Sequence, residues 1–507
     1  MKDQLKAGVV LSYVSTALNI IIQLCYMPVM IRLLGQSEYG LYTLVSGIVS
    51  YLSLFSLGFG GSYLRFSARY KAKQDEKGLS ELNGMFITLF FVLAAAALIC
   101  GMILCQFSRQ VFGDKLSVAE LNKAQLMMAI LVVGISVTLV NSIFDAIITS
   151  YEQFVYQRIL NIISNVANPF ICLPLLIAGK GSVALVIVTA SISVFSLCMN
   201  IWFCICKLKV KISFHHFHFG VLKEISSFSF FLLLNMVIDQ INWNVDKLIL
   251  SHTSGTNEVA VYGVASQINS LVLTFSTTIS SVFSPRVNRI AAEDEINCTE
   301  AFSSLMIRIG RIQWMVLGLV ISGFIIFGDF FIVRIFAGPE YKKAYTVALF
   351  LIIPAVVPLI QNVGIEIQRA LNRHQFRSAI YFFMALINVC VSIPLAEQFG
   401  AVGTAMGTAF SLIVANGLIM NIFYYKALHL DMISFWKSII KCSKGLLIPA
   451  IAGGLIMKYI HFQGIGSYLV GIVIYTIVYC VSICLLGCNT QEKRMIKNLI
   501  GGRKFRK

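Results

Sequence analysis

The sequence predicts an all-α membrane protein with about 14 transmembrane helices, arranged as two parallel six-helix repeats around a central cavity plus two extra C-terminal helices. Of its 507 residues, 58% are hydrophobic and only 12% are charged, and the mean hydropathy is +0.82. Soluble domains carry roughly 25% charged residues. The apolar runs are continuous rather than alternating, which disfavours a membrane β-barrel. The composition therefore excludes a water-soluble enzyme and indicates a polytopic membrane protein.

The apolar runs can be assigned to spans in order, because each crossing needs about 20 apolar residues. An N-terminal six-helix lobe (1–206) is predicted to hold spans at residues 8–31, 39–64, 83–107, 125–149, 155–178 and 182–206. A basic cytoplasmic linker follows at 207–225. The C-terminal six-helix lobe (226–425) is predicted to hold spans at residues 226–250, 258–284, 305–331, 344–370, 376–396 and 401–425. Helices 13 and 14 (445–460 and 464–487, within 445–487) precede a basic cytoplasmic tail, 488–507.

The basic residues orient these spans. The chain carries a net charge of +17, and 30 of its 40 Lys and Arg residues fall on the face that holds both termini. By the positive-inside rule that face is cytoplasmic. We therefore predict a multi-pass protein of a plasma membrane with both termini in the cytoplasm. Anionic lipid headgroups account for the positive excess, so no nucleic acid partner is needed.

The two lobes show internal similarity at a nearly constant offset of 220 to 222 residues. The matching pairs are Glu38 with Glu258, Gln153 with Gln375, Pro174 with Pro394, and Arg65 with Arg286. Both copies begin on the cytoplasmic side, so the repeats are parallel and related by an axis along the membrane normal. Transporters built from such repeats hold their substrate between the two copies.

One helix face of span seven is polar. Asn235, Asp239, Asn242 and Asp246 recur at steps of 0, 4, 7 and 11, which confines them to an arc of about 60° at about 100° per residue. Polar side chains in hydrocarbon face a cavity or a partner helix. Two carboxylates on one stripe would each need a buried partner if the site were dry. This pattern therefore favours a water-filled cavity between the lobes.

Polar stripes also occur in three other spans, and those of spans two and eight are the weaker ones. Span one repeats the four steps of span seven, and span eight carries a matching stripe that begins at Gln267 and resembles one in span two. The residues of span one are Ser12, Thr16, Asn19 and Gln23. Ser, Thr and Asn also join helices by hydrogen bonds throughout membrane proteins. For spans two and eight, the sequence favours neither hydrogen bonding between helices nor the lining of a cavity.

Basic side chains at the span ends are candidates for an anion. Lys247 follows Asp246, while Arg65 and Arg286 close spans two and eight. Arg and Lys both bind phosphate oxygens, but they also anchor helix ends to lipid headgroups. Lys247 also has Asp246 as a neighbour with which to pair. Asp239, Asp246 and Glu366 are candidates for ion coupling, although Glu366 is expected to pair locally with Arg369.

The sequence contains no constellation typical of an enzyme. No phosphate-binding glycine loop, nucleophile elbow or HExxH motif occurs, and we predict no cofactor. The cysteines lack zinc or haem spacing, and His215, His216 and His218 are expected to contact headgroups, so we predict no metal site. No loop exceeds roughly 20 residues. This disfavours a membrane enzyme that transfers sugars, which would need an extramembrane active site.

Two segments resemble a known family. These are RLLGQSEYGLYTLVSGIVSYLSLFSLGFGGSYLRF (Arg32 to Phe66) and NWNVDKLILSHTSGTNEVAVYGVASQI (Asn242 to Ile268). They are similar to the polysaccharide export flippases, in the superfamily that also holds multidrug and toxic compound extrusion carriers and peptidoglycan-precursor flippases. The resemblance covers nearly the whole chain. Lys247 stands where that family more often has Arg, which keeps the positive charge without the planar guanidinium.

The resemblance implies a bacterial flippase rather than an enzyme. Its substrate would be a lipid-linked oligosaccharide, usually attached to undecaprenyl pyrophosphate, moved across the cytoplasmic membrane by alternating access for export of a cell-surface polysaccharide. The expected partners are this substrate, membrane lipids, a coupling ion (H⁺ or Na⁺) and the polysaccharide polymerase machinery. The expected cavity residues are Asn19, Gln23, Arg65, Asn235, Asp239, Asn242, Asp246, Lys247, Gln267 and Arg286. The alternative is a multidrug or organic-cation antiporter of the same superfamily, whose cavity would be net anionic.

Overall fold

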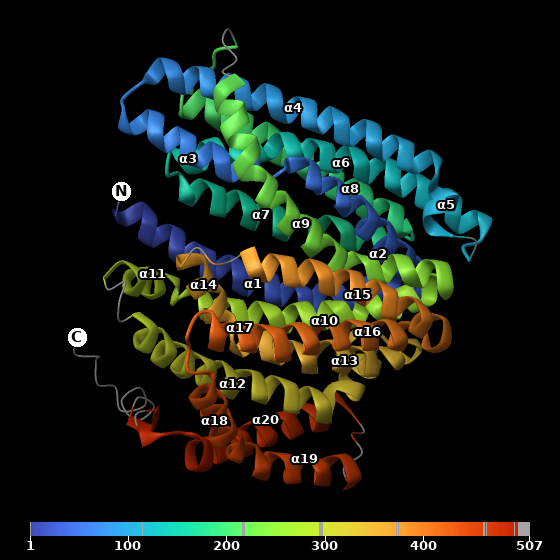
Figure 1. The fold of residues 1–507 in the computed structure, drawn as a ribbon. Coiled ribbons are helices and arrows are strands. Elements are labelled where there is room, and N and C mark those ends of the chain that lie inside the picture. The colour runs from blue at the N-terminus through green and yellow to red at the C-terminus, as the bar shows by residue number, and fades with distance from the viewer. Residues whose placement is uncertain are drawn as a thin grey trace. The chain divides into compact units, whose positions relative to one another are not determined.

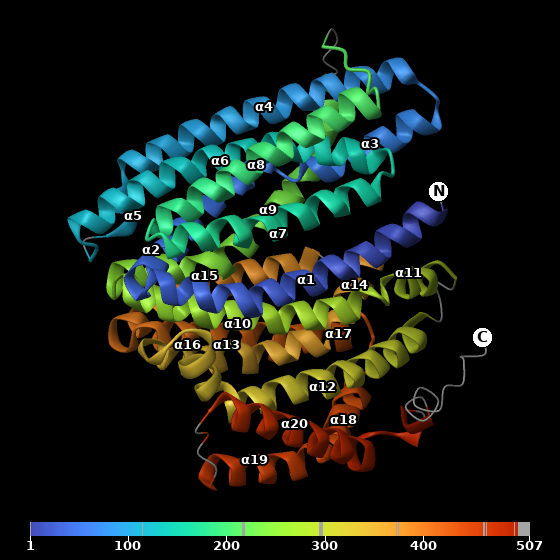
Figure 2. The same ribbon diagram turned by 180° about the vertical axis from the view of Figure 1, so that it is seen from behind.

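The computed structural model describes residues 2–113, 115–214, 219–293, 298–371, 373, 375–459, 462, 464–490 and 492–494, and every regular element in these residues is a helix. The first part of the chain forms α1 (Lys2–Leu34), α2 (Gln36–Ser50), η1 (Tyr51–Ser56), α3 (Phe59–Ala72), α4 (Glu76–Gln106), α5 (Ser108–Phe112), α6 (Val118–Ser150), α7 (Phe154–Ile177), α8 (Gly181–Trp202) and η2 (Phe203–Lys207). Figures 1 and 2 show these elements in blue and cyan to green.

The remaining helices follow in the colours from green to red (Figure 1). They are α9 (Phe219–Thr253), α10 (Thr256–Ser281), α11 (Ser284–Glu293), α12 (Cys298–Phe330), η3 (Phe331–Phe336), η4 (Pro339–Tyr341), α13 (Lys343–Ile360), α14 (Asn362–Ala370), α15 (Gln375–Phe399), α16 (Ala401–Leu412), η5 (Ile413–Ile419), α17 (Met420–Lys426), α18 (Met432–Ser443), η6 (Lys444–Leu446), α19 (Leu447–Tyr459), α20 (Ile465–Ser482) and η7 (Ile483–Gly487).

Thirteen helical segments among the described residues are long and apolar enough to cross a membrane, which confirms an all-α multi-span membrane protein. Large apolar side chains such as Phe91, Val92 and Ile99 on α4 are exposed, as expected of helices that face lipid rather than water. The predicted seventh span lies on α9, many of whose side chains fall outside the described residues. His215, His216 and His218 also lie outside them.

The helices group into two compact units by their contacts. Unit 1 comprises residues 1–263 and 396–404, and unit 2 comprises residues 264–395 and 405–507. In unit 1, α6 packs between α4 and α8, and α1 packs on α7. In unit 2, α12 contacts α13 and α18, and α19 packs on α20 (Figure 2). The six-helix lobes and the linker expected from the sequence divide the chain at other positions and stay a prediction.

Two predicted spans are interrupted. Span two, predicted as continuous from residue 39 to 64, is α2, η1 and α3, with a break at Leu57 and Gly58. Both break residues adopt left-handed backbone conformations, with φ of 48° and 68°, which an α-helix cannot include. Span ten is divided at Gln361 into α13 and α14, just after Pro354 and Pro358. Proline removes a backbone donor and bends a helix.

The internal repeat predicted from the sequence recurs as matching helix caps. Glu38 Oε2 accepts a hydrogen bond from the Ser182 backbone N–H at 3.0 Å, at the start of α8. Glu258 Oε2 accepts one from the Ala401 backbone N–H at 2.9 Å, at the start of α16. The residues before these donors, Gly181 and Gly400, have φ of 64° and 60°, which favours glycine. A carboxylate thus satisfies a free N–H at both helix starts.

Contacts between neighbouring helices are repeated as well. Asn168 Nδ2 of α7 donates to Thr189 Oγ1 of α8 at 3.5 Å, and Asn388 Nδ2 of α15 donates to Thr408 Oγ1 of α16 at 3.4 Å. Two aromatic stacks correspond in the same way: Tyr156 on Phe203 and Phe376 on Phe423, each pair with rings 9° from parallel. These pairs differ by 219 or 220 residues, so the two copies share their internal packing.

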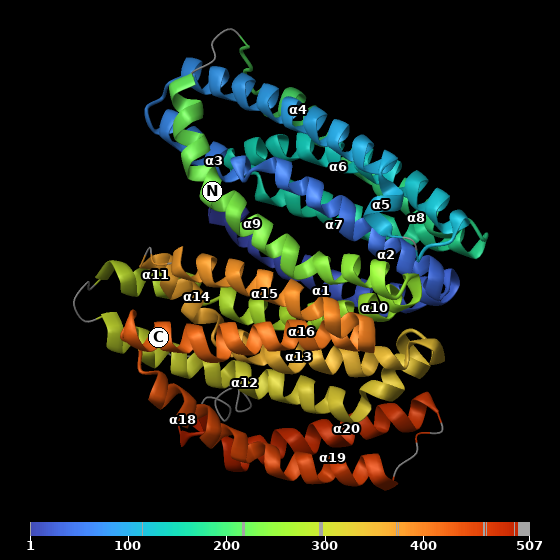
Figure 3. The ribbon, with the colours of Figure 1, turned by 45° about the vertical axis from the view of Figure 1, so that its right-hand side comes forward.

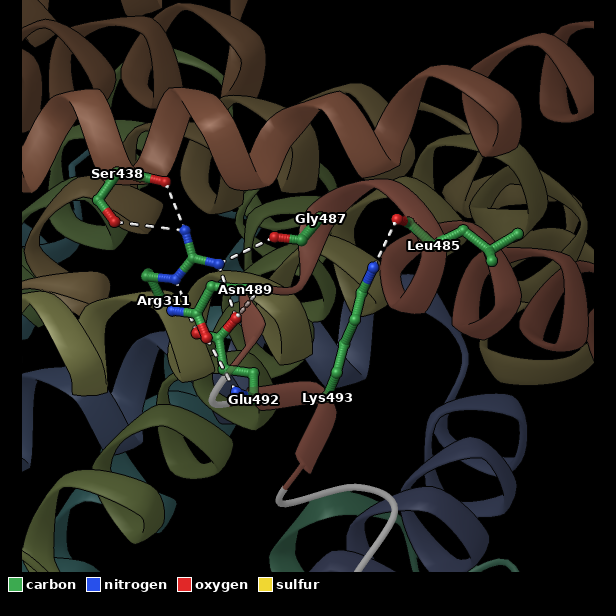
Figure 4. A network of polar contacts seen from close by, with 7 residues as sticks. All are labelled: Arg311, Ser438, Leu485, Gly487, Asn489, Glu492 and Lys493. Atoms are coloured by element: carbon green, nitrogen blue, oxygen red, sulfur yellow. Dashed lines mark hydrogen bonds and ion pairs between the residues drawn. The ribbon is translucent and has the colours of Figure 1, made fainter.

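The C-terminal segment of unit 2 is attached to α12 by a buried ion pair. Arg311 contacts Glu492, the backbone oxygen of Gly487 and both oxygens of Ser438 on α18, at distances between 2.7 and 3.3 Å (Figure 4). Asn489 and Glu492 also cap each other, because Glu492 Oε2 accepts from the Asn489 N–H at 2.7 Å and Asn489 Oδ1 accepts from the Glu492 N–H at 2.9 Å. This network fixes the point at which the basic tail begins.

Candidate functional site

A chain of polar side chains joins α9 to α2 and η1 in unit 1. Asn244 Nδ2 donates to Gln240 Oε1 at 2.7 Å and to Ser50 Oγ at 3.0 Å. Lys247 Nζ donates to Asn244 Oδ1 at 3.2 Å, and Gln240 Nε2 donates to Ser53 Oγ at 3.4 Å. Because Gln240, Asn244 and Lys247 are four and three residues apart, they share one helix face. We call these three residues and Ser50 the α9 polar network.

The network depends on a close approach of α2 to α9, which Figure 3 shows side by side. Gly47 on α2 faces α9, and a Cβ added there would lie 3.3 Å from both Asn244 Oδ1 and Lys247 Cδ. Ser50 follows three residues later, so its hydroxyl meets the same surface and donates to Gln240 Oε1 at 3.1 Å. A small residue at an interhelical contact allows polar side chains to meet across the two helices.

Asp246 is held apart from this network. Its side chain is 1% exposed, and its Oδ2 accepts a hydrogen bond from the Tyr262 hydroxyl of α10. The neighbouring Lys247 is half-buried and turns toward Asn244 instead. Adjacent residues on a helix point about 100° apart, so the Lys247 ammonium group and the Asp246 carboxylate lie on different faces of α9.

The other residues of the predicted stripes are spread over different environments. Asp239 is exposed on α9, and Asn242 is half-buried. Asn235 lies on α9 outside the residues whose side chains are described. On α1, Asn19 and Gln23 are half-buried, and the buried Gln23 Oε1 has no hydrogen-bond donor among the described residues. Such an atom needs a water or ligand partner to offset its burial.

The remaining predicted residues lie on other helices. Arg65 is exposed on α3 in unit 1, and Arg286 is exposed on α11 in unit 2. Gln267 is half-buried on α10 in unit 2. Glu366 pairs with Arg369 at 2.9 Å, which confirms the predicted local pair, and also accepts from Ser284 Oγ at 2.9 Å. Within the described ranges, no group of three or more His, Cys, Asp or Glu residues is placed to hold a metal.

Sequence reasoning missed a second polar cluster in unit 1, around Asp145 of α6. The Asn200 amide of α8 donates to Asp145 Oδ1 at 2.8 Å and to Asn141 Oδ1 at 2.9 Å. Asn141 Nδ2 in turn lies 3.3 Å from Asp145 Oδ2. Asn200 is fully buried. The available signal was a lone Asp inside an otherwise apolar run, which is costly in a membrane unless it has partners or a function.

An apolar cavity of about 290 Å³ lies in unit 2. Its walls come from α10, α12, α13 and α20, and include Phe275, Phe327 and Tyr475. These walls carry little hydrogen-bonding capacity, so the cavity suits a hydrocarbon group rather than a sugar or phosphate.

Comparison with known proteins identifies the family. A model of the family described as "Polysaccharide biosynthesis protein" matches residues 5–291, which is more than half of the chain. The chain belongs to this family. A Shigella flexneri protein named "Putative O-antigen transporter" is 21% identical over 394 residues, which is 76% of this chain and 89% of that protein.

Solved structures share the fold. The lipid II flippase MurJ, in an inward closed conformation, superposes with a TM-score of 0.77 at 16% identity and covers 97% of this chain and 100% of its own. A MATE family multidrug resistance transporter of the MOP superfamily gives a TM-score of 0.62 at 16% identity and covers 82% and 99%. These two solved structures are a flippase and a transporter, and their likeness to this chain shows a shared fold. The chain itself is a multi-pass membrane protein.

Proposed function

We propose that this polysaccharide biosynthesis protein flips a lipid-linked oligosaccharide, attached through undecaprenyl pyrophosphate, from the cytoplasmic to the outer leaflet of a bacterial plasma membrane. The product serves export of a cell-surface polysaccharide, and both termini lie in the cytoplasm. The observation that carries this proposal is the α9 polar network, which places amide, hydroxyl and ammonium groups on helices that are otherwise apolar. Contacts with the polysaccharide polymerase machinery belong to the same proposal.

The network has the chemistry that a sugar phosphate needs. Gln240, Asn244 and Ser50 offer both hydrogen-bond donors and acceptors, which match sugar hydroxyls. Lys247 offers a positive point charge for a pyrophosphate oxygen. We propose that the sugar and pyrophosphate pass along this face of α9 with Asn19, Gln23, Arg65, Asn235, Asn242, Gln267 and Arg286 as further contacts.

A polyprenyl chain has the opposite requirement, because it stays in an apolar environment at no desolvation penalty. The cavity bordered by Phe275, Phe327 and Tyr475 offers such an environment. Its volume of about 290 Å³ suits a part of a polyprenyl chain. We propose that this cavity contacts the tail while the head group crosses by alternating access.

Coupling to H⁺ or Na⁺ is proposed for the carboxylates of α9. Ionisable groups within membrane helices commonly mark ion pathways. Asp246 is buried against Tyr262, and Asp239 lies seven residues earlier on the same stripe. Glu366 is held by Arg369 and Ser284, so we rank it behind the two aspartates.

The test is a flipping assay in proteoliposomes with a fluorescent undecaprenyl-pyrophosphate oligosaccharide. We expect Asp239→Ala, Asp246→Ala and Lys247→Ala each to reduce flipping while the amount of reconstituted protein is unchanged. Lys180→Ala, at an exposed position between α7 and α8, is the matched control and should keep wild-type activity. Wild-type flipping in all three variants would refute the site.

The same vesicles test the alternative function. A labelled organic cation is loaded in place of the lipid, and its movement is followed with a proton or sodium gradient. Uptake of the cation without flipping of the lipid-linked sugar would identify a drug antiporter and overturn the proposal. Flipping without cation uptake supports it.

A further inference from the structure

Residues 207–214, which begin at the end of η2, lie along α4 in unit 1. Apolar and polar residues alternate in this segment, and Leu208, Val210 and Ile212 pack against the core formed by α3, α4 and α6. The Ser213 N–H donates to the Ser80 carbonyl at 3.0 Å. Lys209 and Lys211 are exposed, whereas Leu208, Val210 and Ile212 are partly buried, so the two lysines lie on the side away from the core.

A glycine on α4 permits this arrangement. A Cβ added at Gly84 would overlap the backbone oxygen of Ser213. One residue earlier, Asn83 Nδ2 donates to the Lys211 backbone oxygen at 3.0 Å, while Asn83 Oδ1 accepts from the Tyr63 hydroxyl at 2.7 Å. The backbone of the segment is therefore held at two points, by the Ser80 carbonyl and by the Asn83 side chain, which fixes where the Lys209 and Lys211 side chains begin.

The segment closes one side of a cavity of about 600 Å³, which we call the α3–α4 cleft. Lys71, Lys209 and Lys211 line it, together with Gln74 and Tyr151. Lys71 Nζ donates to the Ser150 backbone oxygen and lies 3.7 Å from the centre of the Tyr151 ring. Gln74 and Lys209 have φ of 55° and 49°. A left-handed backbone is strained for a residue other than glycine and persists only where the surrounding structure enforces it. Such residues are concentrated at binding sites.

The acidic residues of the cleft are already engaged. Glu76 pairs with Lys211 at 2.6 Å, and Asp75 Oδ1 accepts the Gly78 N–H at 2.8 Å as the N-cap of α4. Among the described residues, no carboxylate pairs with Lys209, whose side chain is exposed at the rim. Of the three lysines that line the cleft, Lys211 is paired with Glu76, so Lys71 and Lys209 are the ammonium groups available to a ligand.

We propose that the α3–α4 cleft binds the phosphate group of an anionic amphiphile from the cytoplasmic leaflet, as a site separate from the α9 polar network. Ammonium groups bind phosphate oxygens as point charges with three donors each. The cleft lies on the face that the charge distribution predicts to be cytoplasmic, where anionic phospholipids concentrate. The ring of Tyr151 supplies an apolar wall for the glycerol part of a headgroup.

The test uses full-length protein, purified and delipidated in a neutral detergent, and measures binding by isothermal titration calorimetry. The probes are short-chain phosphatidylglycerol, short-chain phosphatidylcholine and inorganic phosphate. We expect saturable binding of phosphatidylglycerol, and a loss of about fivefold in affinity for Lys209→Gln and again for Lys71→Gln, since a lysine near a lipid surface contributes about 1 kcal/mol. The affinity should fall as salt is added.

Lys77→Gln is the matched control, because Lys77 is an exposed lysine on α4 that does not line the cleft. Its affinity for phosphatidylglycerol should equal that of the wild type. Binding of inorganic phosphate with the same dependence on Lys209 supports the phosphate site and assigns it to a soluble anion. An equal loss in Lys77→Gln, equal binding of phosphatidylcholine, or no saturable binding of either anion overturns the proposal.

A second variant tests the geometry without removing a charge. Gly84→Val should displace residues 207–214 from α4 and thereby move Lys209 and Lys211 out of the cleft. We expect weaker phosphatidylglycerol binding together with faster hydrogen exchange at the Ser213 amide. Faster exchange at Ser213 with wild-type affinity would also overturn the proposal, since it would show that the segment is not part of the site.

Discussion

Arg311 and Glu492 form a bidentate ion pair, with Arg311 Nε 2.7 Å from Glu492 Oε1 and Arg311 Nη2 2.7 Å from Glu492 Oε2. The two side chains are 5% and 12% exposed. The three remaining N–H groups donate to both oxygens of Ser438 and to the Gly487 backbone oxygen, so all five N–H groups of this arginine have an acceptor. Parallel Arg–carboxylate bonds are among the strongest charge-assisted hydrogen bonds in proteins.

Removal of one partner should be strongly destabilising. Glu492→Leu leaves the Arg311 guanidinium buried without its counter-charge, and a broken buried pair of this kind costs about 3–5 kcal/mol. We expect a clear fall in melting temperature in detergent, measured by thermal unfolding. The double variant Arg311→Met with Glu492→Leu should be more stable than Glu492→Leu alone, because no buried charge remains. Glu300→Gln, an exposed change on α12, is the control, and a fall of the same size there would contradict the interpretation.

The same pair predicts a pH dependence. Burial raises the pKa of Glu492, but the hydrogen bonds from Arg311 and the Asn489 backbone outweigh it and hold that pKa below its ordinary value. The contribution of Glu492 to the free energy of unfolding is therefore complete above the ordinary glutamate pKa of about 4.3, and is lost as the pH falls through the lower pKa of the folded protein. The difference in melting temperature between wild type and Glu492→Gln should persist down to about pH 5 and shrink below about pH 4. A constant difference over that range would refute this role.

The matched helix caps predict matched losses. Glu38→Ala and Glu258→Ala each remove the carboxylate acceptor of a backbone N–H at a helix start, that of Ser182 or that of Ala401. Loss of a cap costs about 0.5–2 kcal/mol, so each variant should lower the melting temperature modestly. Glu340→Ala, at an exposed position, should have no effect. A lower melting temperature for only one of the two variants would show that this cap stabilises only one copy.

The approach of α2 to α9 can be tested at Gly47. Gly47→Leu places a bulky side chain against Asn244 and Lys247, and should separate the two helices and reduce flipping severalfold at unchanged protein level. Gly47→Ala should have a smaller effect, because its Cβ would lie 3.3 Å from the nearest side-chain atoms. The flipping assay in proteoliposomes measures the activity of both variants. Equal activity of Gly47→Leu and wild type would show that this contact does not matter for transport.

The Asp145 cluster predicts a stability effect. Asn200→Leu removes both amide hydrogen bonds to Asp145 and Asn141, and an unsatisfied buried polar group costs about 1–3 kcal/mol. Thermal unfolding should show a lower melting temperature for Asn200→Leu. The further change Asp145→Leu should restore part of it, because the carboxylate that lost its donor is then absent. No difference between the single and the double variant would contradict this coupling.

The sequence predicts the helical scaffold and its internal duplication. The lengths of the apolar runs and the spacing between repeated residues can both be read from a single chain. Glu38 and Glu258 were recognised as a repeat, and in the structure both accept a backbone N–H at a helix start. The local pair of Glu366 with Arg369 was also correct, since residues three apart on a helix are neighbours. Orientation by charge counting stays a prediction, as do the six-helix lobes.

Other features depend on information that hydropathy does not carry. The hydropathy of an apolar run does not depend on whether its helix is interrupted. Hydropathy therefore could not predict the left-handed residues Leu57 and Gly58 within span two. The stripe rule identified Asp246 but not its partner, because Tyr262 comes from another helix. It also overlooked the adjacent face with Gln240 and Asn244, whose roles emerge only when Ser50 is placed opposite them.

The duplicated caps and lateral contacts have an evolutionary consequence. They show the same framework twice in one chain, as duplication of a half-length sequence would produce. The polar stripes differ between the two copies: the stripe of span one is uncharged, whereas its counterpart on α9 carries Asp239 and Asp246. The framework contacts are therefore present in both copies, whereas the carboxylates of the stripe occur in only one of them.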